Sequence, residues 1–402
     1  MAEREGFEPS IRFCRILTFQ ASAFDHSATA PHALEIARPS GLGRLSQAGG
    51  LWHERGMTAS ALRAPRLAPL FAAPLLAVLP PASAQEAAPS PQTALAPSEI
   101  VDAAPAGDWR DIAAQDLLVM TLAPDARGHA RRLVIQLMPA PLSQAWVDNI
   151  RALARAHWYD GVAVTRVQDN YVAQWGDPDG EEAAKAKPLP AGLAATSEAG
   201  YVVDGKDDPA LSRALLRNGM QAASMIGRAH GDASPAPRRR GDAYADGTLF
   251  FQGWPLATQA DTTHVWPIHC YASVGVGRGM SPDAGTGAEL YAVIGHAPRH
   301  LDRNIAVVGR VIEGIDLLSS LPRGTGPLGF YEDPAQRVPV VSIRLTSDLP
   351  AAQRPRFQYL ATDSAAFARY ADARANRRDP FFIVPAGGAD ICNIPVPIRP
   401  AP

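Results

Sequence analysis

The chain has 402 residues, of which 47% are hydrophobic, the share expected of a globular protein with a sizeable core. Its 38 basic residues nearly balance its 40 acidic ones, and the net charge of −2 excludes the basic excess of a dedicated nucleic-acid binder. The Arg238–Arg240 cluster is accompanied by no further basic cluster and no stacking aromatic residues, so we expect a solvated loop there and no nucleic-acid partner.

The N-terminal region has the layout of an export signal. Residues 1–56 show no sustained helical or strand period, and we interpret them as a non-native leader upstream of a start at Met57. After Met57 come two arginines, an apolar run over 67–79 and the small residues 82–84, in the order of a secretory signal peptide. A Pro/Ala-rich linker is the alternative. We predict cleavage after about Ala84, a periplasmic or secreted protein and no stable membrane insertion, because the run is short and interrupted by prolines.

The next part of the chain changes from a spacer to a folded pattern. Residues 85–105 are rich in alanine and proline and predict a disordered linker, with order beginning near Trp109. Strands are predicted at 117–122 and at 133–137, where a near-continuous apolar run suits a buried strand. Apolar residues then recur at i, i+4, i+7 and i+8, which predicts an amphipathic helix over about 142–156.

A hairpin is predicted directly after this helix. Turn residues at 160–161, 169–170 and 178–180 flank two runs of β-forming residues, 162–167 and 171–175. With the alternation of a strand, Arg166 shares a face with two valines. Burying an unpaired guanidinium is costly, so this arginine lies either at a strand end or where its charge is used.

The order of these elements resembles the N-terminal half of a cyclophilin-type peptidyl-prolyl cis-trans isomerase. Over 131–180 the chain has a strand, a Pro-led helix, Tyr-Asp-Gly, an arginine-bearing strand and a Gln-x-Gly-Asp-Pro-x-Gly turn. Segments 269–291 and 300–318 resemble the second half more loosely. We therefore expect a cyclophilin-like domain over 106–349, interrupted by an insertion at about 185–268.

The resemblance implies a mainly β fold: a closed eight-stranded antiparallel barrel with two flanking helices. The last strand is expected at 338–345, and residues 350–402 form a C-terminal extension with a possible helix over 362–377. Helical spacing over 211–226 indicates that part of the insertion packs as a subdomain.

The resemblance also assigns roles to residues of the hairpin. Arg166 matches the catalytic arginine, and Gln174 matches a glutamine that binds the substrate backbone. Tyr171 matches an aromatic wall of the proline pocket, and Val172 is a further substrate-binding candidate. Strand alternation alone directs Gln174 away from Tyr171, so a twist or bulge is needed to bring them to one pocket.

The second half departs from the family pattern at the pocket. The second aromatic residue maps to Tyr291 or, in an ungapped reading, to Ala292. His300 replaces the aromatic residue before Leu-Asp and is a candidate substrate-binding residue together with Tyr291. A histidine expected in the pocket falls near Ile305 or Asn304.

Two functions fit these residues. The first is an isomerase that acts on X-Pro bonds of exported polypeptides and assists their folding. The second is a binding or chaperone module of the same fold with little or no turnover. Either takes proline-containing polypeptides as partners, and we expect a monomer.

Two cysteines lie in the region after the predicted signal. Cys270 and Cys392 form a disulfide that tethers the C-terminal tail, or they are two buried thiols. His264, His269 and Cys270 would bind zinc only with a ligand from elsewhere.

Other cofactor motifs are weak. His296 and His300 are four residues apart, but Pro298 between them argues against one helical face. The glycine-rich run 324–329 matches a dinucleotide fingerprint but contains Pro327 and precedes no predicted helix. We expect no metal and no cofactor.

Overall fold

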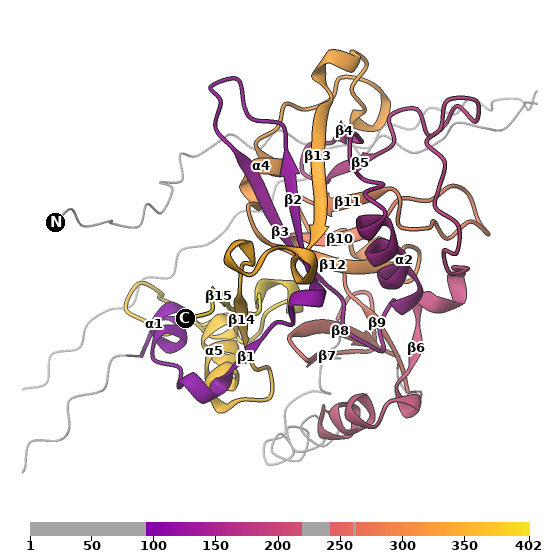
Figure 1. Ribbon diagram of the computed structural model, residues 1–402. Coiled ribbons are helices and arrows are strands. Elements are labelled where there is room, and N and C mark those ends of the chain that lie inside the picture. The colour runs from indigo at the N-terminus through magenta and orange to yellow at the C-terminus, as the bar shows by residue number, and fades with distance from the viewer. Residues whose placement is uncertain (1–93, 219–241, 260–262) are drawn as a thin grey trace, which may run out of the picture. The chain divides into compact units, whose positions relative to one another are not determined.

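The computed structural model describes residues 94–218, 242–259 and 263–402 (Figure 1). The leader, the signal peptide, the start of the linker and the Arg238–Arg240 cluster lie outside these residues. Within the described ranges, no helix is long and apolar enough to cross a membrane.

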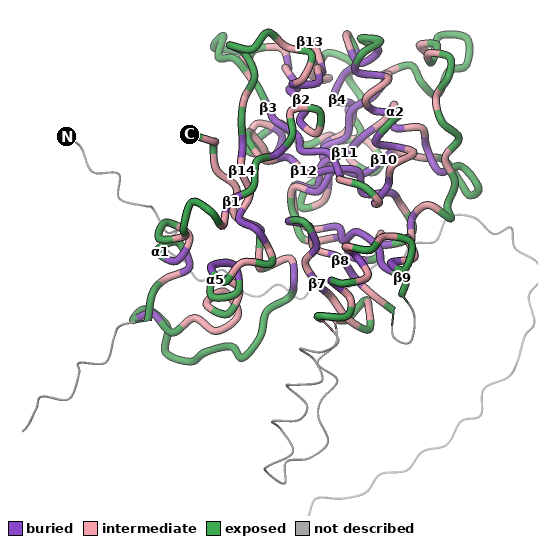
Figure 2. Tube along the Cα trace, turned by 60° about the horizontal axis from the view of Figure 1, so that its bottom comes forward, coloured by how far each residue is buried: buried purple, intermediate pink, exposed green. Residues whose placement is uncertain are grey.

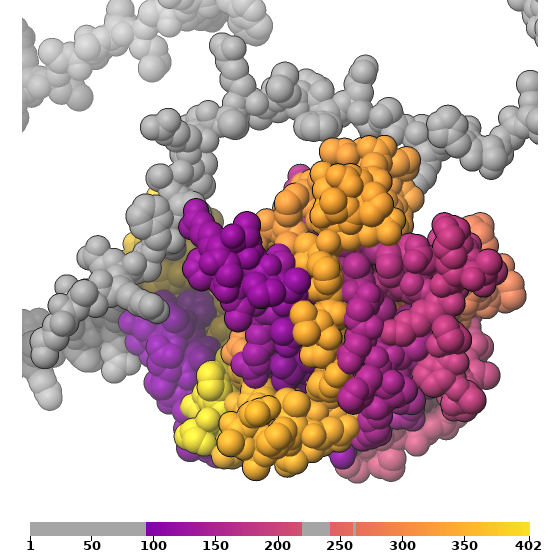
Figure 3. Space-filling model, turned by 45° about the horizontal axis from the view of Figure 1, so that its top comes forward, coloured from indigo at the N-terminus to yellow at the C-terminus, as the bar shows by residue number. Residues whose placement is uncertain are grey.

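Eight strands close into an antiparallel barrel in the order β10-β11-β5-β4-β13-β2-β3-β12. They are β2 (Leu117–Leu122), β3 (Arg131–Leu137), β4 (Ala163–Val167), β5 (Val172–Gly176), β10 (Ser273–Val276), β11 (Leu290–Val293), β12 (Val307–Glu313) and β13 (Val338–Leu345). The expected fold class is confirmed. Figure 3 shows β13 in orange, lying between the purple β2–β3 hairpin and the magenta segment that contains β4.

Apolar side chains that point into the barrel form its core, and the buried trace in Figure 2 is concentrated in these strands. Met120, Leu133 and Ile343 are fully buried there. The predicted helix is α2 (Gln144–Arg155), which adds Trp146 to the core. A second, short helix, α4 (Ile315–Ser319), follows β12 and packs against β3.

The Tyr-Asp-Gly motif fixes the segment between α2 and β4. Asp160 accepts two hydrogen bonds of 2.6 Å from the guanidinium of Arg344 in β13. Tyr159 donates its hydroxyl to the carbonyl oxygen of Gly287 at 2.6 Å. Gly161 has a φ of 81°, in the left-handed region that favours glycine. The motif thus ties the start of the β4–β5 hairpin to the barrel.

The insertion contains its own sheet. Its strands are β6 (Val203–Asp204), β7 (Gly247–Phe251), β8 (Trp254–Thr258) and β9 (His264–Pro267), in the order β6-β9-β8-β7. Residues 209–218 are helical, and the rest of the helical pattern predicted to 226 lies outside the described residues. The segment thus contributes a sheet separate from the barrel, within the same compact unit of residues 85–402.

The two ends of the described chain pack together. β1 (Trp109–Asp111), β14 (Phe357–Leu360) and β15 (Ile398–Pro400) form a three-stranded sheet, in the order β1-β14-β15. The helix expected over 362–377 is α5 (Ala365–Ala375). The C-terminal extension is thus joined by strand pairing to residues at the start of the predicted domain.

The expected disordered linker is wrong for its last residues. α1 (Pro97–Asp102) is a helix, and order begins well before Trp109. Proline at the first helical position favours a helix start, and Ile100 is 8% exposed because it packs in one cluster with Phe367 of α5. An Ala/Pro-rich composition therefore concealed a short helix whose partner lies far along the chain.

Of the two alternatives for the cysteines, the disulfide is present. Cys270 and Cys392 are bonded, with their Cα atoms 5.2 Å apart. The bond joins the segment before β10 to the C-terminal segment, across 122 residues of sequence. The C-terminal tail is thus tethered covalently to the body.

Candidate active site

The candidate site lies on the outer face of the barrel, over β4, β5 and β11. In β5, Ala173 and Trp175 point into the barrel core, so Val172 and Gln174 face outward. Tyr291 of β11 is paired with Gln174 and lies on the same face. Antiparallel register therefore brings side chains from distant parts of the sequence into one row.

Arg166 is held over this row by hydrogen bonds from three directions. Its Nη1 donates to Oε1 of Gln174 at 2.9 Å, and its Nε donates to the carbonyl oxygen of Leu328 at 2.7 Å. Its Nη2 donates to Oε1 of Gln168. A bulge between Val164 and Arg166 shifts the register so that Arg166 lies opposite Gln174. This bulge lies in β4, whereas the irregularity expected from the sequence was one that brings Gln174 beside Tyr171.

Two aromatic rings flank the guanidinium. Its carbon lies 5.7 Å from the ring centroid of Tyr171 and 5.4 Å from that of Phe330, within cation–π range. Arg166, Tyr171 and Gln174 therefore converge, as the catalytic reading required. Phe330 follows the glycine-rich run 324–329, which packs beside β4 and carries no helix of the kind that a dinucleotide fold needs.

An apolar cluster lies beside Arg166. Val172, Tyr291 and Val293 are buried in it, and Leu301 and Ile305 pack against them.

The residues of this cluster distinguish between alternatives that the sequence left open at two positions, 291 or 292 and 304 or 305. Tyr291, and not Ala292, faces this site, because Ala292 points into the barrel core. Ile305, and not Asn304, occupies the place where a histidine was expected.

Tyr171 also packs against this cluster and is stacked with His300, their ring centroids 6.3 Å apart. The structure thus brings together every site residue proposed from the sequence: Arg166, Tyr171, Val172, Gln174, Tyr291 and His300. Sequence reasoning missed Leu301, although its position directly after His300 in the Leu-Asp motif could have signalled it.

A series of buried hydrogen bonds connects the hydroxyl of Tyr291 to His269 and Asp302. This hydroxyl lies 2.9 Å from Nε2 of His269, and Nδ1 of His269 lies 2.9 Å from Asp302. The carboxylate accepts the Nδ1 proton, which leaves Nε2 to accept the tyrosine hydroxyl. Asp302 also binds Arg299 at 2.6 Å, and Arg299 is paired with Asp242 of the insertion. Burial raises the pKa of Tyr291 well above its ordinary value, so this hydroxyl stays protonated.

The same hydrogen bonds leave His269 without a free ring nitrogen for a zinc ion. Both of its ring nitrogens are used by protein partners, and Cys270 is in the disulfide. Among the described residues, no group of three histidine, cysteine or acidic side chains is placed to hold a metal ion.

Glu289 extends the row beyond Gln174. Nε2 of Gln174 donates to Oε1 of Glu289 at 2.6 Å, so the amide of Gln174 bridges the arginine and the carboxylate. Burial raises the pKa of Glu289, and the hydrogen bond from Gln174 opposes that shift. Burial also lowers the pKa of Arg166, but a guanidinium in proteins keeps its charge at neutral pH. The site therefore presents a fixed cation, an amide and a carboxylate beside an apolar wall.

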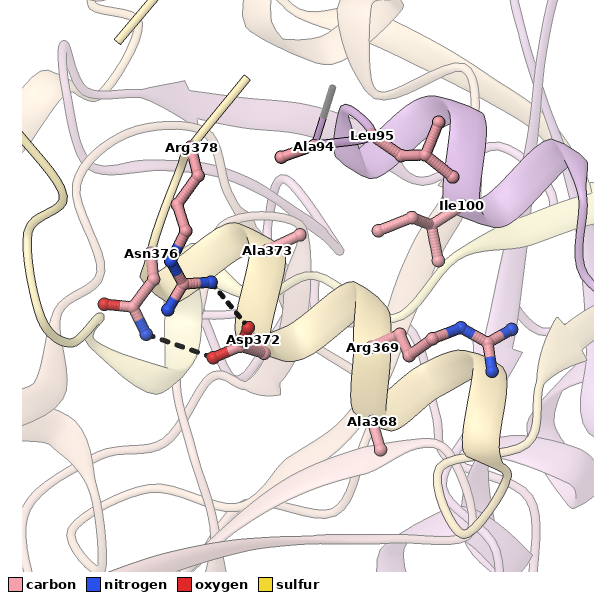
Figure 4. Close-up of a pocket in the computed structure, with 9 residues that line it drawn as sticks. All are labelled: Ala94, Leu95, Ile100, Ala368, Arg369, Asp372, Ala373, Asn376 and Arg378. Atoms are coloured by element: carbon pink, nitrogen blue, oxygen red, sulfur yellow. Dashed lines mark hydrogen bonds and ion pairs between the residues drawn. The ribbon is translucent and has the colours of Figure 1, made fainter. Parts of the chain in front are cut away.

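A separate pocket lies between α1 and α5 and has a volume of about 490 Å³ (Figure 4). It is lined by Ala94, Leu95, Ile100, Ala368, Arg369, Asp372, Ala373, Asn376 and Arg378. The carboxylate of Asp372 is bound by Asn376 and Arg378. The pocket shares no residue with the row around Arg166, and two of its charged groups, Asp372 and Arg378, are paired with each other.

A comparison with models of known families identifies one family for this chain. Residues 127–345 match the sequence model of the family described as cyclophilin type peptidyl-prolyl cis-trans isomerase/CLD, which is more than half of the chain. No curated protein matches the sequence.

Several solved structures are similar. Cyclophilin AquaCyp293 from Hirschia baltica has 21% identity and a TM-score of 0.48, covering 73% of this chain and 93% of that chain. A Cryptosporidium parvum cyclophilin type peptidyl-prolyl cis-trans isomerase has 11% identity and a TM-score of 0.30, covering 57% of this chain and 96% of that chain. The same parasite protein, in the presence of the dipeptide Ala-Pro, has 12% identity and a TM-score of 0.30, covering 56% and 98%. From the family match, the chain belongs to the cyclophilin-type peptidyl-prolyl cis-trans isomerase family.

Proposed function

We propose that this protein is an active peptidyl-prolyl cis-trans isomerase that acts on X-Pro bonds of polypeptides. The observation that carries the proposal is the position of Arg166, a fixed cation beside an apolar cluster on the outer face of the barrel. Such a surface can hold a proline ring and place a hydrogen-bond donor next to its nitrogen.

The chemistry needs little more than this donor. Isomerisation breaks no bond, and its barrier is the loss of amide resonance as the X-Pro bond twists. In the twisted state the proline nitrogen regains its lone pair, and a preorganised donor stabilises that state more than the planar one. A guanidinium has five N–H donors, and three nitrogens of Arg166 already donate to Gln174, Gln168 and Leu328. These bonds fix the group while donors remain for the substrate.

The other site residues bind and orient the peptide. Tyr171, Val172 and Tyr291 provide the apolar wall for the proline ring, and His300 extends it by stacking on Tyr171. Gln174 lies between Arg166 and Glu289, where its amide can exchange a hydrogen bond with the substrate backbone. Arg166 and Gln174 are thus the catalytic pair of the proposal.

We also propose that the substrates are exported polypeptides whose folding the protein assists. The signal-like sequence that starts at Met57 supports export, and so does the disulfide between Cys270 and Cys392, because disulfides persist in oxidising compartments. This part of the proposal is tested separately, by locating the protein in cell fractions and by sequencing its N-terminus. A mature N-terminus near Gln85 in an exported fraction is expected, and an intact leader in the cytoplasm would overturn it.

The activity is tested by a protease-coupled assay on an X-Pro peptide with the purified protein. Arg166→Ala should lower kcat/KM by about 100-fold or more, as expected for loss of a preorganised donor. Arg132→Ala is the matched control, because this exposed arginine of β3 only faces Glu313 at 3.6 Å. Equal activity of Arg166→Ala and wild type would refute the role of the arginine.

A binding module without turnover is the second candidate, favoured by one observation. Ile305 stands where the family pattern has a histidine, and His300 stands where it has a larger aromatic residue. The contacts available to the proline ring therefore differ from the family pattern. Peptide binding by wild type without any turnover would support this candidate.

A further inference from the structure

Glu289 lies one step along the same outward-facing ladder as Tyr291. Glu289 directly precedes β11 and lies two residues before Tyr291. Leu290 between them points into the core, so the side chains of Glu289 and Tyr291 point to the same face, about 7 Å apart along the chain. The proline wall therefore continues directly into a carboxylate.

Two glycines leave room for this carboxylate. A Cβ on Gly176 would lie 3.0 Å from Cγ of Glu289, and a Cβ on Gly277 would lie 2.9 Å from its Oε2. Larger residues at either position would displace the side chain. The absence of a Cβ at both glycines thus leaves space for the side chain of Glu289 at this place.

The carboxylate has no cation bonded directly to it, although the charge of Arg166, which is joined to it through Gln174, lowers its pKa. Its hydrogen bond is to the neutral amide of Gln174, and the nitrogens of Arg166 donate to Gln174, Gln168 and Leu328 instead. Within ranges 94–218, 242–259 and 263–402, Glu289 forms no ion pair.

The side chain is nevertheless reachable from solvent, because it is only partly buried. Glu181, which is exposed, adds a like charge that raises the pKa of Glu289 further. A partly desolvated carboxylate that is not bonded directly to a cation attracts one more strongly than a fully hydrated carboxylate does.

We propose that Glu289 is a specificity-determining residue that selects substrates with a lysine or arginine within two positions of the proline. This inference rests on the proposed isomerase function. A peptide whose proline lies against Tyr291 has neighbouring side chains within about 7 Å of it, which a lysine or arginine side chain spans easily. The ammonium or guanidinium would then complete the ion pair that the folded chain leaves open.

The test compares three peptides that differ at one position next to the proline, which is lysine, glutamine or glutamate. NMR exchange measures kcat/KM without a coupling protease. Wild type should prefer the lysine peptide over the glutamate peptide by about tenfold at low salt, since attraction and repulsion both contribute. Glu289→Gln, which keeps an acceptor for Gln174, should bring this ratio close to one. Glu181→Gln is the control and should change the ratio by less than about twofold.

A second measurement needs no variant. The wild-type ratio should fall as salt rises from about 0.01 to 1 M, where the Debye length shrinks from about 30 Å to about 3 Å. Turnover of all three peptides at equal rates would overturn this inference and leave the isomerase function standing. No turnover of any peptide would overturn the isomerase function itself.

Discussion

Replacing His269 with alanine should destabilise the protein and loosen the wall of the candidate site. The histidine is fully buried, and its ring is the hydrogen-bond partner of the Tyr291 hydroxyl. The substitution leaves that hydroxyl unpaired in a residue that is only 5% exposed. It also removes one hydrogen bond from Asp302, which keeps its bond to Arg299.

The size of the effect follows from these contacts. An unsatisfied buried hydroxyl costs about 1–3 kcal/mol, and a lost hydrogen bond to a carboxylate costs about 1.5–3 kcal/mol. Together they predict a loss of about 3–5 kcal/mol in the free energy of unfolding. Tyr291→Phe removes only the hydroxyl and leaves Nε2 of His269 unpaired, so it should cost about 1–2 kcal/mol.

Urea denaturation of wild type, both single variants and the double variant measures these values, if the slope of each transition is unchanged. The double variant no longer has the unpaired hydroxyl. It should therefore lose at least about 1 kcal/mol less than the sum of the single variants. Additive losses, or a loss below about 1 kcal/mol for His269→Ala, would refute the hydrogen-bonded chain beneath Tyr291.

Three further predictions concern the frame of the site. Reducing the Cys270–Cys392 disulfide should lower the free energy of unfolding by about 2–5 kcal/mol in urea titrations, because the bond closes 122 residues; an unchanged midpoint would contradict this. The Arg344 hydrogen bonds hold the pKa of Asp160 below its ordinary value. Asp160→Asn should therefore lower the free energy of unfolding by about 1 kcal/mol at pH 7. The difference between variant and wild type should become smaller below about pH 4, because protonation of Asp160 then removes the same stabilisation from wild type. Gly295→Ala should lower kcat/KM about tenfold or more, because a Cβ there would clash with the backbone of the β4–β5 turn; full activity would show that the turn can move.

The β4–β5 hairpin could be predicted from the sequence because its signals are local. Asp160-Gly161 and Asp169-Asn170 set the two reversals, and the β-forming run after each of them became β4 and β5, within a residue at each end. The positions of Arg166 and Gln174 within these runs then followed from counting. Local turn chemistry and alternation thus determine half of the site.

The position of the bulge that brings Arg166 opposite Gln174 could not be predicted from the sequence, which indicated only that some irregularity was needed. Flat alternation does not place the arginine, Tyr171 and Gln174 together, and the sequence carries no signal for the position of the irregularity. The structure puts the bulge between Val164 and Arg166, in the strand that carries Arg166 itself.

The supporting residues could not be predicted, because their partners are far apart in the chain. Tyr291 and His269 are separated by 22 residues, and Gln174 and Glu289 by 115. Only tertiary pairing of separate elements, such as β11 with β5 and with β10, brings such residues into contact, and a single sequence carries no record of that pairing. The burial of α1 against α5 was missed for the same reason.

The central claim is that this site accelerates rotation about an X-Pro bond, and one measurement tests it most directly. Two-dimensional NMR exchange on a proline peptide, with a small fraction of wild-type protein, reports the rate of cis-trans interconversion itself. The uncatalysed exchange takes tens to hundreds of seconds at 25 °C, and we predict exchange cross-peaks on a far shorter timescale. Peptide resonances that shift on binding while exchange stays at the uncatalysed rate would contradict the account.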